Sequence, residues 1–183
     1  PDGKYLAVTH SNQNIRENLG IDASTNGGLQ VRETETGKVV WEKNLNPGAF
    51  GIVEFGPYGR QLVVHSGSSI ADSCVRVYEA ETGLEVWSTP VRGYLHDAVF
   101  SPDGQRIFLS SWHSFAASSS SRLDCWNVKD QSSIWSAVRS VSSGLAITRD
   151  GSQVLTGGPS HSIQVWDAAT GEQLEEIMGD QVD

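Results

Sequence analysis

Five histidines are the first residues to consider for chemistry, because the imidazole ring is widely used for metal binding and for proton transfer near neutral pH. They are scattered along the chain, at His10, His65, His96, His113 and His161. A metal site needs three or four ligands that converge on one point. The histidines show no fixed ligand spacing, and Cys74 and Cys125 do not form a metal-type pair. The sequence therefore predicts no metal site.

Nucleophilic, carboxylate and phosphate-binding chemistry is not indicated either. Ser66-Gly67-Ser68 lacks the strand-to-helix elbow that exposes and activates a serine. The carboxylate pairs Glu33/Glu35 and Glu79/Glu81 flank predicted turns, where solvated charge is expected. Gly157-Gly158-Pro159 is not followed by a helix whose dipole would hold a phosphate. We predict no catalytic residue and no cofactor-binding residue, and therefore a protein that is not an enzyme.

The elements that would position any site are predicted from an internal repeat of about 45 residues. A first tight turn recurs at Pro1-Asp2-Gly3, Pro57-Tyr58-Gly59, Pro102-Asp103-Gly104 and Arg149-Asp150-Gly151. A second recurs at Glu35-Thr36-Gly37, Glu81-Thr82-Gly83, Lys129-Asp130-Gln131 and Ala169-Thr170-Gly171. Pro, Asp and Gly each favour tight turns, and the flanking apolar residues alternate with period two, which indicates strands.

These units predict an all-β protein, a β-propeller arc of about four four-stranded antiparallel blades with an incomplete first blade. The expected blades span residues 1–46 (incomplete), 47–91, 92–138 and 139–178, and residues 179–183 would begin the next. An up-and-down barrel is the alternative, although equal blocks of four strands count against it. Two loops between second and third strands are expected to be enlarged, Ser11–Asn26 and the serine-rich His113–Ser121.

Two groups of residues resemble known propellers. Phe100-Ser101-Pro102-Asp103-Gly104, followed by Trp126, resembles WD repeats, as does the segment from Trp166-Asp167 to Thr170-Gly171. The Gly-His pair of that family is missing, so its His–Ser/Thr–Trp–Asp hydrogen-bond network is expected to be largely absent. Tryptophans four residues after the second turn are similar to those of quinoprotein-type propellers and are expected to pack between adjacent blades; they are Trp41, Trp87 and Trp135.

The expected first blade lacks its innermost strand, and residues 179–183 are too short and too polar to supply it. The chain is therefore expected to be an arc of a larger ring, which the WD-repeat resemblance implies has seven blades, with the missing blades of the same chain among its partners. Its two end faces would be bare, which favours self-association.

The charge balance and the loops define the expected function. A formal charge of −9 without a basic stripe argues against nucleic acid and against an anionic membrane surface as partners. With no long apolar run, a soluble protein is expected, with the cytoplasm slightly preferred. We predict a non-catalytic WD-repeat-like scaffold that binds a protein partner through residues on its loops. The candidate contact residues are Asn14, Arg16, His113, Phe115 and His161.

Two alternatives stay open at this point. One is a segment of a quinoprotein-like oxidoreductase whose active-site residues lie outside these residues. The other is a purely structural repeat whose only role is assembly.

Overall fold

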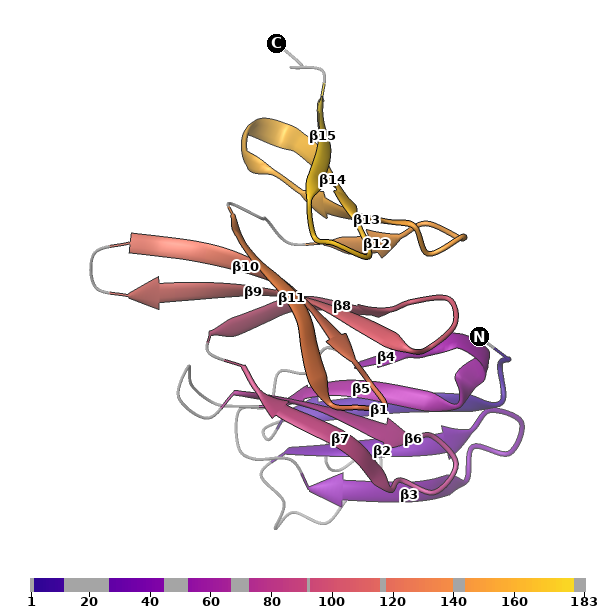
Figure 1. Ribbon diagram of the computed structural model, residues 1–183. Coiled ribbons are helices and arrows are strands. Elements are labelled where there is room, and N and C mark those ends of the chain that lie inside the picture. Colours follow the sequence, from indigo (N-terminus) through magenta and orange to yellow (C-terminus); the bar gives the residue numbers. More distant parts are fainter. Residues whose placement is uncertain are drawn as a thin grey trace. The chain divides into compact units, whose positions relative to one another are not determined.

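The computed structural model describes residues 2–11, 27–44, 53–66, 73–91, 93–115, 118–139 and 144–179. The described residues form strands β1 to β15 and two short 3-10 turns, with no α-helix among them (Figure 1). They divide into two compact units, Pro1–Val91 and Arg92–Asp183, which are described separately.

The first unit holds two antiparallel sheets. Its first sheet has three strands in the order β1-β2-β3, and its second has four in the order β4-β5-β6-β7. A 3-10 turn, η1 (Pro57–Gly59), joins β4 to β5. The strands are β1 (Tyr5–Ser11), β2 (Gly27–Glu33), β3 (Val39–Asn44), β4 (Val53–Phe55), β5 (Gln61–Ser66), β6 (Cys74–Glu79) and β7 (Glu85–Pro90).

The second unit holds two four-stranded antiparallel sheets. The third sheet of the chain has the order β8-β9-β10-β11 and the fourth β12-β13-β14-β15. A second 3-10 turn, η2 (Pro159–His161), joins β13 to β14. The strands are β8 (Tyr94–Phe100), β9 (Arg106–Phe115), β10 (Ser118–Asn127), β11 (Ser132–Arg139), β12 (Leu145–Ile147), β13 (Gln153–Gly157), β14 (Ser162–Asp167) and β15 (Gln173–Met178).

The predicted fold class is confirmed. Every sheet is an antiparallel meander in which strands adjacent in sequence are also adjacent in the sheet, and the first sheet has three strands instead of four. A register shift recurs at the same place in each sheet, between Val31 and Arg32, Val77 and Tyr78, Cys125 and Trp126, and Val165 and Trp166. The repeat in sequence is therefore a repeat in backbone geometry.

The prediction of an enlarged loop at His113–Ser121 is wrong. Strand β9 continues to Phe115 and β10 begins at Ser118, with Phe115 opposite Ser118 and His113 opposite Ser120. This outer part of the β9–β10 hairpin extends past both neighbouring strands (Figure 1). Backbone hydrogen bonds hold a two-stranded ladder whatever the side chains, so a serine-rich segment with little β-propensity can still be a strand.

Aspartates hold three of the four first turns. Each accepts a hydrogen bond from the backbone N–H two residues later, from Lys4 to Asp2 at 3.1 Å, from Gln105 to Asp103 at 3.0 Å and from Ser152 to Asp150 at 3.1 Å. These bonds stabilise the ionised carboxylate. The pKa of Asp103 is lowered mainly by the hydrogen bond from the Ser101 hydroxyl, and the backbone bond adds to this effect. The pKa of Asp150 falls to about 2, mainly through the hydrogen bond from the Thr148 hydroxyl, and its backbone bond again adds to the effect.

Asp150 is expected to make the fold acid-sensitive. Its pKa is lower in the folded chain than the usual 3.8, so its stabilising effect is present above about pH 4 and is lost as the pH falls toward 2. Urea unfolding of the wild type and of Asp150→Asn, at about pH 6 and at intervals down to about pH 2, measures this effect. The difference in unfolding free energy between them should shrink as the pH falls. A difference that stays constant over this range would contradict the assignment.

The two sheets of the first unit pack through an apolar core that includes Trp41. Leu29 and Val31 of β2 lie against Leu62 and Val64 of β5 and Tyr78 of β6, all buried. Trp41 Nε1 donates a hydrogen bond of 2.7 Å to the Ala80 carbonyl, and its ring lies 5.8 Å from that of Tyr78. The ring also covers Gly83, since a Cβ on that glycine would lie 2.7 Å from Trp41 Cδ2.

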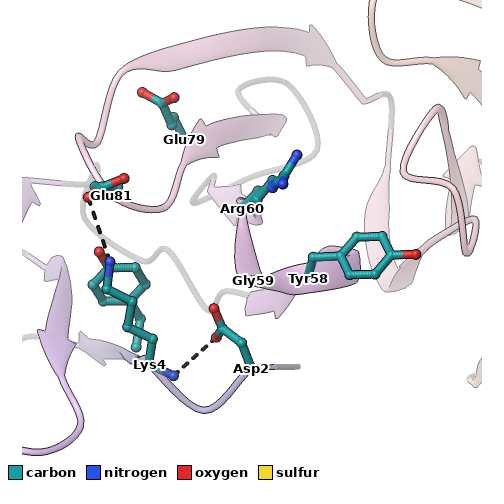
Figure 2. A pocket seen from close by; sticks show the side chains of 8 residues that line it. Asp2, Lys4, Tyr58, Gly59, Arg60, Glu79 and Glu81 are labelled. Carbon is teal, nitrogen blue, oxygen red and sulfur yellow. Dashed lines mark hydrogen bonds and ion pairs between the residues drawn. The ribbon is translucent and has the colours of Figure 1, made fainter.

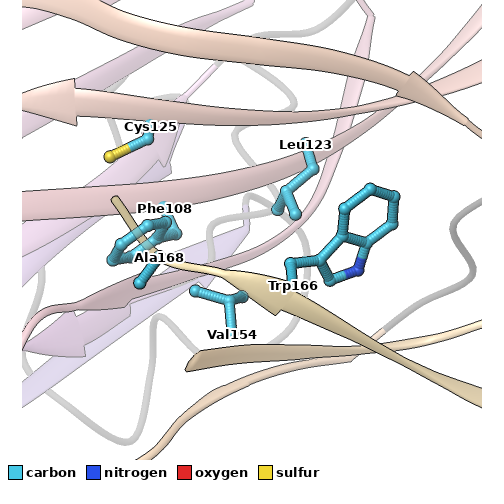
Figure 3. Close-up of a cluster of buried hydrophobic side chains, with 6 residues drawn as sticks. All are labelled: Phe108, Leu123, Cys125, Val154, Trp166 and Ala168. Carbon is cyan, nitrogen blue, oxygen red and sulfur yellow. The ribbon is translucent and has the colours of Figure 1, made fainter. Parts of the chain in front are cut away.

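The two sheets of the second unit pack in the same way (Figure 3). Phe108, Leu123 and Cys125 of the third sheet meet residues of the fourth sheet that include Val154 and Trp166. Burial raises the pKa of the Cys125 thiol to about 12, so the thiol stays protonated. Both cysteines are free; Cys125 is buried and Cys74 is partly buried.

Trp135 has the same role here that Trp41 has in the first unit. Its Nε1 donates to the Ala168 carbonyl at 3.2 Å, and a Cβ on Gly171 would lie 2.5 Å from its ring. Arg106 donates to the same carbonyl at 2.9 Å. The prediction that these tryptophans pack between adjacent sheets is confirmed for Trp41 and Trp135. Trp87 is buried, with 2% of its surface exposed.

Candidate functional site

The first turn of the second sheet departs from the other three. Tyr58 stands where those turns have aspartate, and it lies in the left-handed region at φ 63° and ψ 14°. Gly59, which follows it, is also left-handed, at φ 66°. This conformation costs a residue with a Cβ about 1–2 kcal/mol, and the side chain of Tyr58 is 70% exposed, so no burial offsets that cost. Gln131, Ser160 and His161 are also exposed and left-handed, so the large aromatic side chain, together with this backbone, is what sets the turn at Tyr58 apart.

The packing of the first sheet holds this turn in place. The Asp2 carboxylate lies directly over Gly59, where a Cβ would be 2.6 Å from Asp2 Oδ1. The Gly59 amide donates to the Gly56 carbonyl at 3.2 Å, and the Ala80 amide donates to the Arg60 carbonyl at 2.8 Å. The turn is therefore bonded on both sides of Tyr58, and its two long side chains extend from a fixed backbone.

A pocket of about 510 Å³ opens beside this turn (Figure 2). Three segments line it: the start of the first sheet, the η1 turn and the turn after β6. The lining residues are Asp2, Lys4, Tyr5, Tyr58, Gly59, Arg60, Glu79 and Glu81.

Most charges of the pocket are used within the fold. Lys4 Nζ lies 3.6 Å from the Glu81 carboxylate and 4.8 Å from the centre of the Tyr5 ring. Glu79 accepts a hydrogen bond from the Thr82 hydroxyl. Among the described residues, the Arg60 guanidinium has no ion-pair or hydrogen-bond partner. The pocket thus offers an exposed phenol and a guanidinium beside three carboxylates, of which Lys4 pairs with one, an arrangement suited to binding polar groups.

A buried Ser–His pair lies elsewhere in the second sheet. His65 Nε2 is 2.6 Å from Ser73 Oγ, and the two residues are 6% and 4% exposed. A nucleophile must meet its substrate, and here the surrounding strands cover both groups. The pair joins the end of β5 to the residue before β6, and it is a structural contact.

The residues predicted to contact a partner do not gather at this pocket. Asn14 and Arg16 lie outside the described residues. His113 and Phe115 lie on the backbone of β9, but their side chains are outside the described part of the chain. His161 is exposed at the end of η2, with φ 62°. The predicted contact surface therefore stays a prediction.

Sequence reasoning missed the pocket, although one signal for it was visible. In the alignment of first turns, Pro57-Tyr58-Gly59 is the one unit with an aromatic residue at the aspartate position. An exposed tyrosine in a turn otherwise built for aspartate is a reason to expect a binding role. The other lining residues come from segments far apart in sequence, and only the packing of two sheets brings them together.

Groups of metal ligands and membrane-crossing helices are both absent from the described residues. No three His, Cys, Asp or Glu side chains there form a group that could hold a metal ion. No helix in the same part of the chain has the length and apolar character needed to cross a bilayer.

Comparison with known proteins gives a family. The family model described as outer membrane protein assembly factor BamB matches residues 25–178, which is most of the chain. No curated protein matches the chain.

Proposed function

Since the chain belongs to the β-propeller repeat family described as outer membrane protein assembly factor BamB, we propose that it is a propeller scaffold that binds a protein partner at the pocket beside Tyr58. The family description names an assembly factor, which favours a binding role over a catalytic one. The observation that carries the proposal is the exposed, left-handed Tyr58 on a fixed turn.

The chemistry of the pocket suits a protein partner. Tyrosine and arginine are enriched among the residues that contribute most to protein–protein binding, because each offers a large contact area together with hydrogen-bond donors. Tyr58 and Arg60 are two residues apart, and their backbone is fixed before binding. A fixed backbone lowers the entropy lost on association. The partner is expected to place a carboxylate or a carbonyl group against the Arg60 guanidinium.

Tyr58→Asn is expected to separate binding from stability. Asparagine tolerates the left-handed region and can make the turn bond that aspartate makes in the other repeats. The variant should therefore be more stable than the wild type, by about 0.5–1 kcal/mol in urea unfolding. Its binding to the partner should weaken at least about tenfold.

The measurement uses the full chain, immobilised and exposed to extract of the source cells, with retained proteins quantified by mass spectrometry. Proteins that bind at the pocket should be retained by the wild type and by the control variant Arg149→Ala. Arg149 is an exposed turn residue of the fourth sheet. They should be lost with Tyr58→Asn and with Arg60→Ala. Equal retention by all four proteins would refute the proposed site.

The alternative is a segment of a quinoprotein-like oxidoreductase. The observation that favours it is the tryptophan placement, since Trp41 and Trp135 pack between sheets as the quinoprotein resemblance implies. A quinone absorbance in the purified protein would support this alternative, whereas site-dependent retention of a protein partner would support the scaffold.

Two finer expectations remain part of the proposal. WD-repeat character is supported by one link of that family's hydrogen-bond network, from Trp166 Nε1 to Thr156 Oγ1 at 3.0 Å. A cytoplasmic location stays an expectation from composition, and fractionation of the source cells tests it.

A further inference from the structure

Two layers of side chains lie between the third and fourth sheets. The first layer is apolar, and its members belong to the core of the second unit: Val99, Phe108, Cys125 and Trp135 of the third sheet and Ile147, Val154 and Trp166 of the fourth. The second layer lies two residues further along each strand, on the same faces, because alternate residues of a strand share a face. Its members are Asp97, Ser110, Leu123 and Ala137 of the third sheet and Leu145, Thr156 and Gln164 of the fourth.

Direct contacts show that the two rows of the second layer face each other. The Leu145 amide donates to Asp97 Oδ2 at 2.8 Å, which joins the rows at one end. Leu123 lies in the apolar core that both sheets share (Figure 3). Ser110 stands between Asp97 and Leu123 in its row, and Thr156 stands next to Leu145 in the opposite row. Ser110 and Thr156 therefore occupy the middle of the second layer.

Two buried polar atoms of the second layer have no hydrogen-bond partner among the described residues. They are Ser110 Oγ and Gln164 Oε1, although Ser110 is only 1% exposed and Gln164 only 5%. Thr156 stands beside Gln164 and accepts a hydrogen bond of 3.0 Å from Trp166 Nε1, so its own hydroxyl hydrogen is left to donate. Buried polar groups in native proteins are almost always hydrogen-bonded, either to the protein or to ordered water.

The equivalent layer of the first unit is apolar. There Leu29 of the first sheet packs with Val53 and Val64 of the second in one core. Val64 holds the repeat position of Thr156, since each follows the glycine of its first turn by five residues. The same type of interface thus forms with a valine at this position. The polar groups of the second unit are therefore not needed to pack two sheets together.

We propose that the second unit holds one buried water molecule in the second layer, hydrogen-bonded to Gln164 Oε1 and to Ser110 Oγ. An amide oxygen can only accept, so the bound molecule must donate to Gln164. Water donates two hydrogen bonds and accepts two, so it can also accept from the hydroxyls of Ser110 and Thr156. None of these three residues is more than 5% exposed, which limits the occupant to a molecule as small as water. The inference does not depend on the proposed binding function at Tyr58.

Magnetic relaxation dispersion of water oxygen-17 tests the site directly, because it counts water molecules that a protein holds for longer than its tumbling time. The full chain carrying Ser110→Ala and Gln164→Met should lose the contribution of one such water relative to the wild type. Methionine is close to glutamine in volume and has no amide oxygen. Ser133→Ala, which changes an exposed serine of β11, should keep the wild-type contribution. A double variant with the wild-type contribution would overturn the proposal.

The sign of the stability change gives a second test. If water bonds the Ser110 hydroxyl, Ser110→Ala should lower the ratio of folded to unfolded chain at least about fivefold in urea unfolding. If that hydroxyl is unpaired, its removal should raise the ratio instead, and this result would contradict the proposal. In a Gln164→Met background the water is already lost, so Ser110→Ala should no longer lower the ratio. An equal decrease in both backgrounds would also count against the water, and a cooperative transition shows that each variant folds.

Discussion

Trp135→Ala is expected to lower the free energy of unfolding by about 3 kcal/mol. The indole contacts the core between the third and fourth sheets, with its ring 5.9 Å from Phe108 and directly over Gly171. Removing it leaves a cavity between two sheets that meet largely through apolar side chains. The estimate lies at the lower end for a tryptophan in a core because Trp135 is only partly buried.

Two further variants separate the contributions of Trp135. Trp135→Phe keeps an aromatic ring but loses the hydrogen bond to the Ala168 carbonyl, and it should cost about 1 kcal/mol. Arg106 still donates to that carbonyl, which limits the loss. Ile134→Ala changes the adjacent residue on the other face of β11, which is 43% exposed, and should cost about 0.5 kcal/mol. Urea unfolding, monitored by circular dichroism, measures the loss of unfolding free energy in all three variants. Equal losses for Trp135→Ala and Ile134→Ala would disprove the packing role of Trp135.

The strands could be predicted from the sequence because Pro, Asp and Gly favour tight turns by their own conformational preferences and so mark where the strands end. Strand β6 runs from Cys74 to Glu79, as the alternation of apolar residues between two turn motifs predicts. The contacts of Trp41 and Trp135 between sheets were predicted from a resemblance, since tryptophans at this distance from the second turn are similar to those of quinoprotein-type propellers. Such features depend on residues close together in the chain, and a single sequence records them directly.

The β9–β10 hairpin shows where sequence reasoning fails. His113–Ser121 looks like a loop because its serines favour no regular structure, but the strand pair continues to Phe115 and Ser118. The ladder is held by backbone groups, which are the same in every residue, so side-chain preference alone gives the wrong boundary.

The pocket beside Tyr58 depends on long-range packing. Its walls come from residues 2–5, 58–60 and 79–81, and they meet because the first sheet packs on the second. The alignment of turns could single out Tyr58, but its left-handed backbone and the position of Asp2 over Gly59 follow from the packed structure.

Gly171→Ala is expected to destabilise the chain far more than Gly37→Ala, although the two glycines share one backbone conformation. Their φ angles are +73° and +68°, so alanine carries a similar conformational cost of about 1 kcal/mol at either position. At Gly37 the added methyl group meets no atom within 4 Å, whereas at Gly171 it would lie 2.5 Å from Trp135 Cδ2. Forcing the indole away should add about 1–3 kcal/mol.

A double-mutant cycle assigns that difference to the tryptophan. In a Trp135→Ala background the added methyl group no longer meets an indole, so Gly171→Ala should then cost about as much as Gly37→Ala, near 1 kcal/mol. Gly83→Ala against Trp41 repeats the test in the first unit, where the added Cβ would lie 2.7 Å from Trp41 Cδ2. If Gly171→Ala and Gly37→Ala cost the same in the wild-type background, the indole does not rest on the turn. Unequal costs that vanish without the tryptophan would identify Gly83 and Gly171 as the surfaces on which the second and fourth sheets receive the tryptophan of the preceding sheet in the same unit.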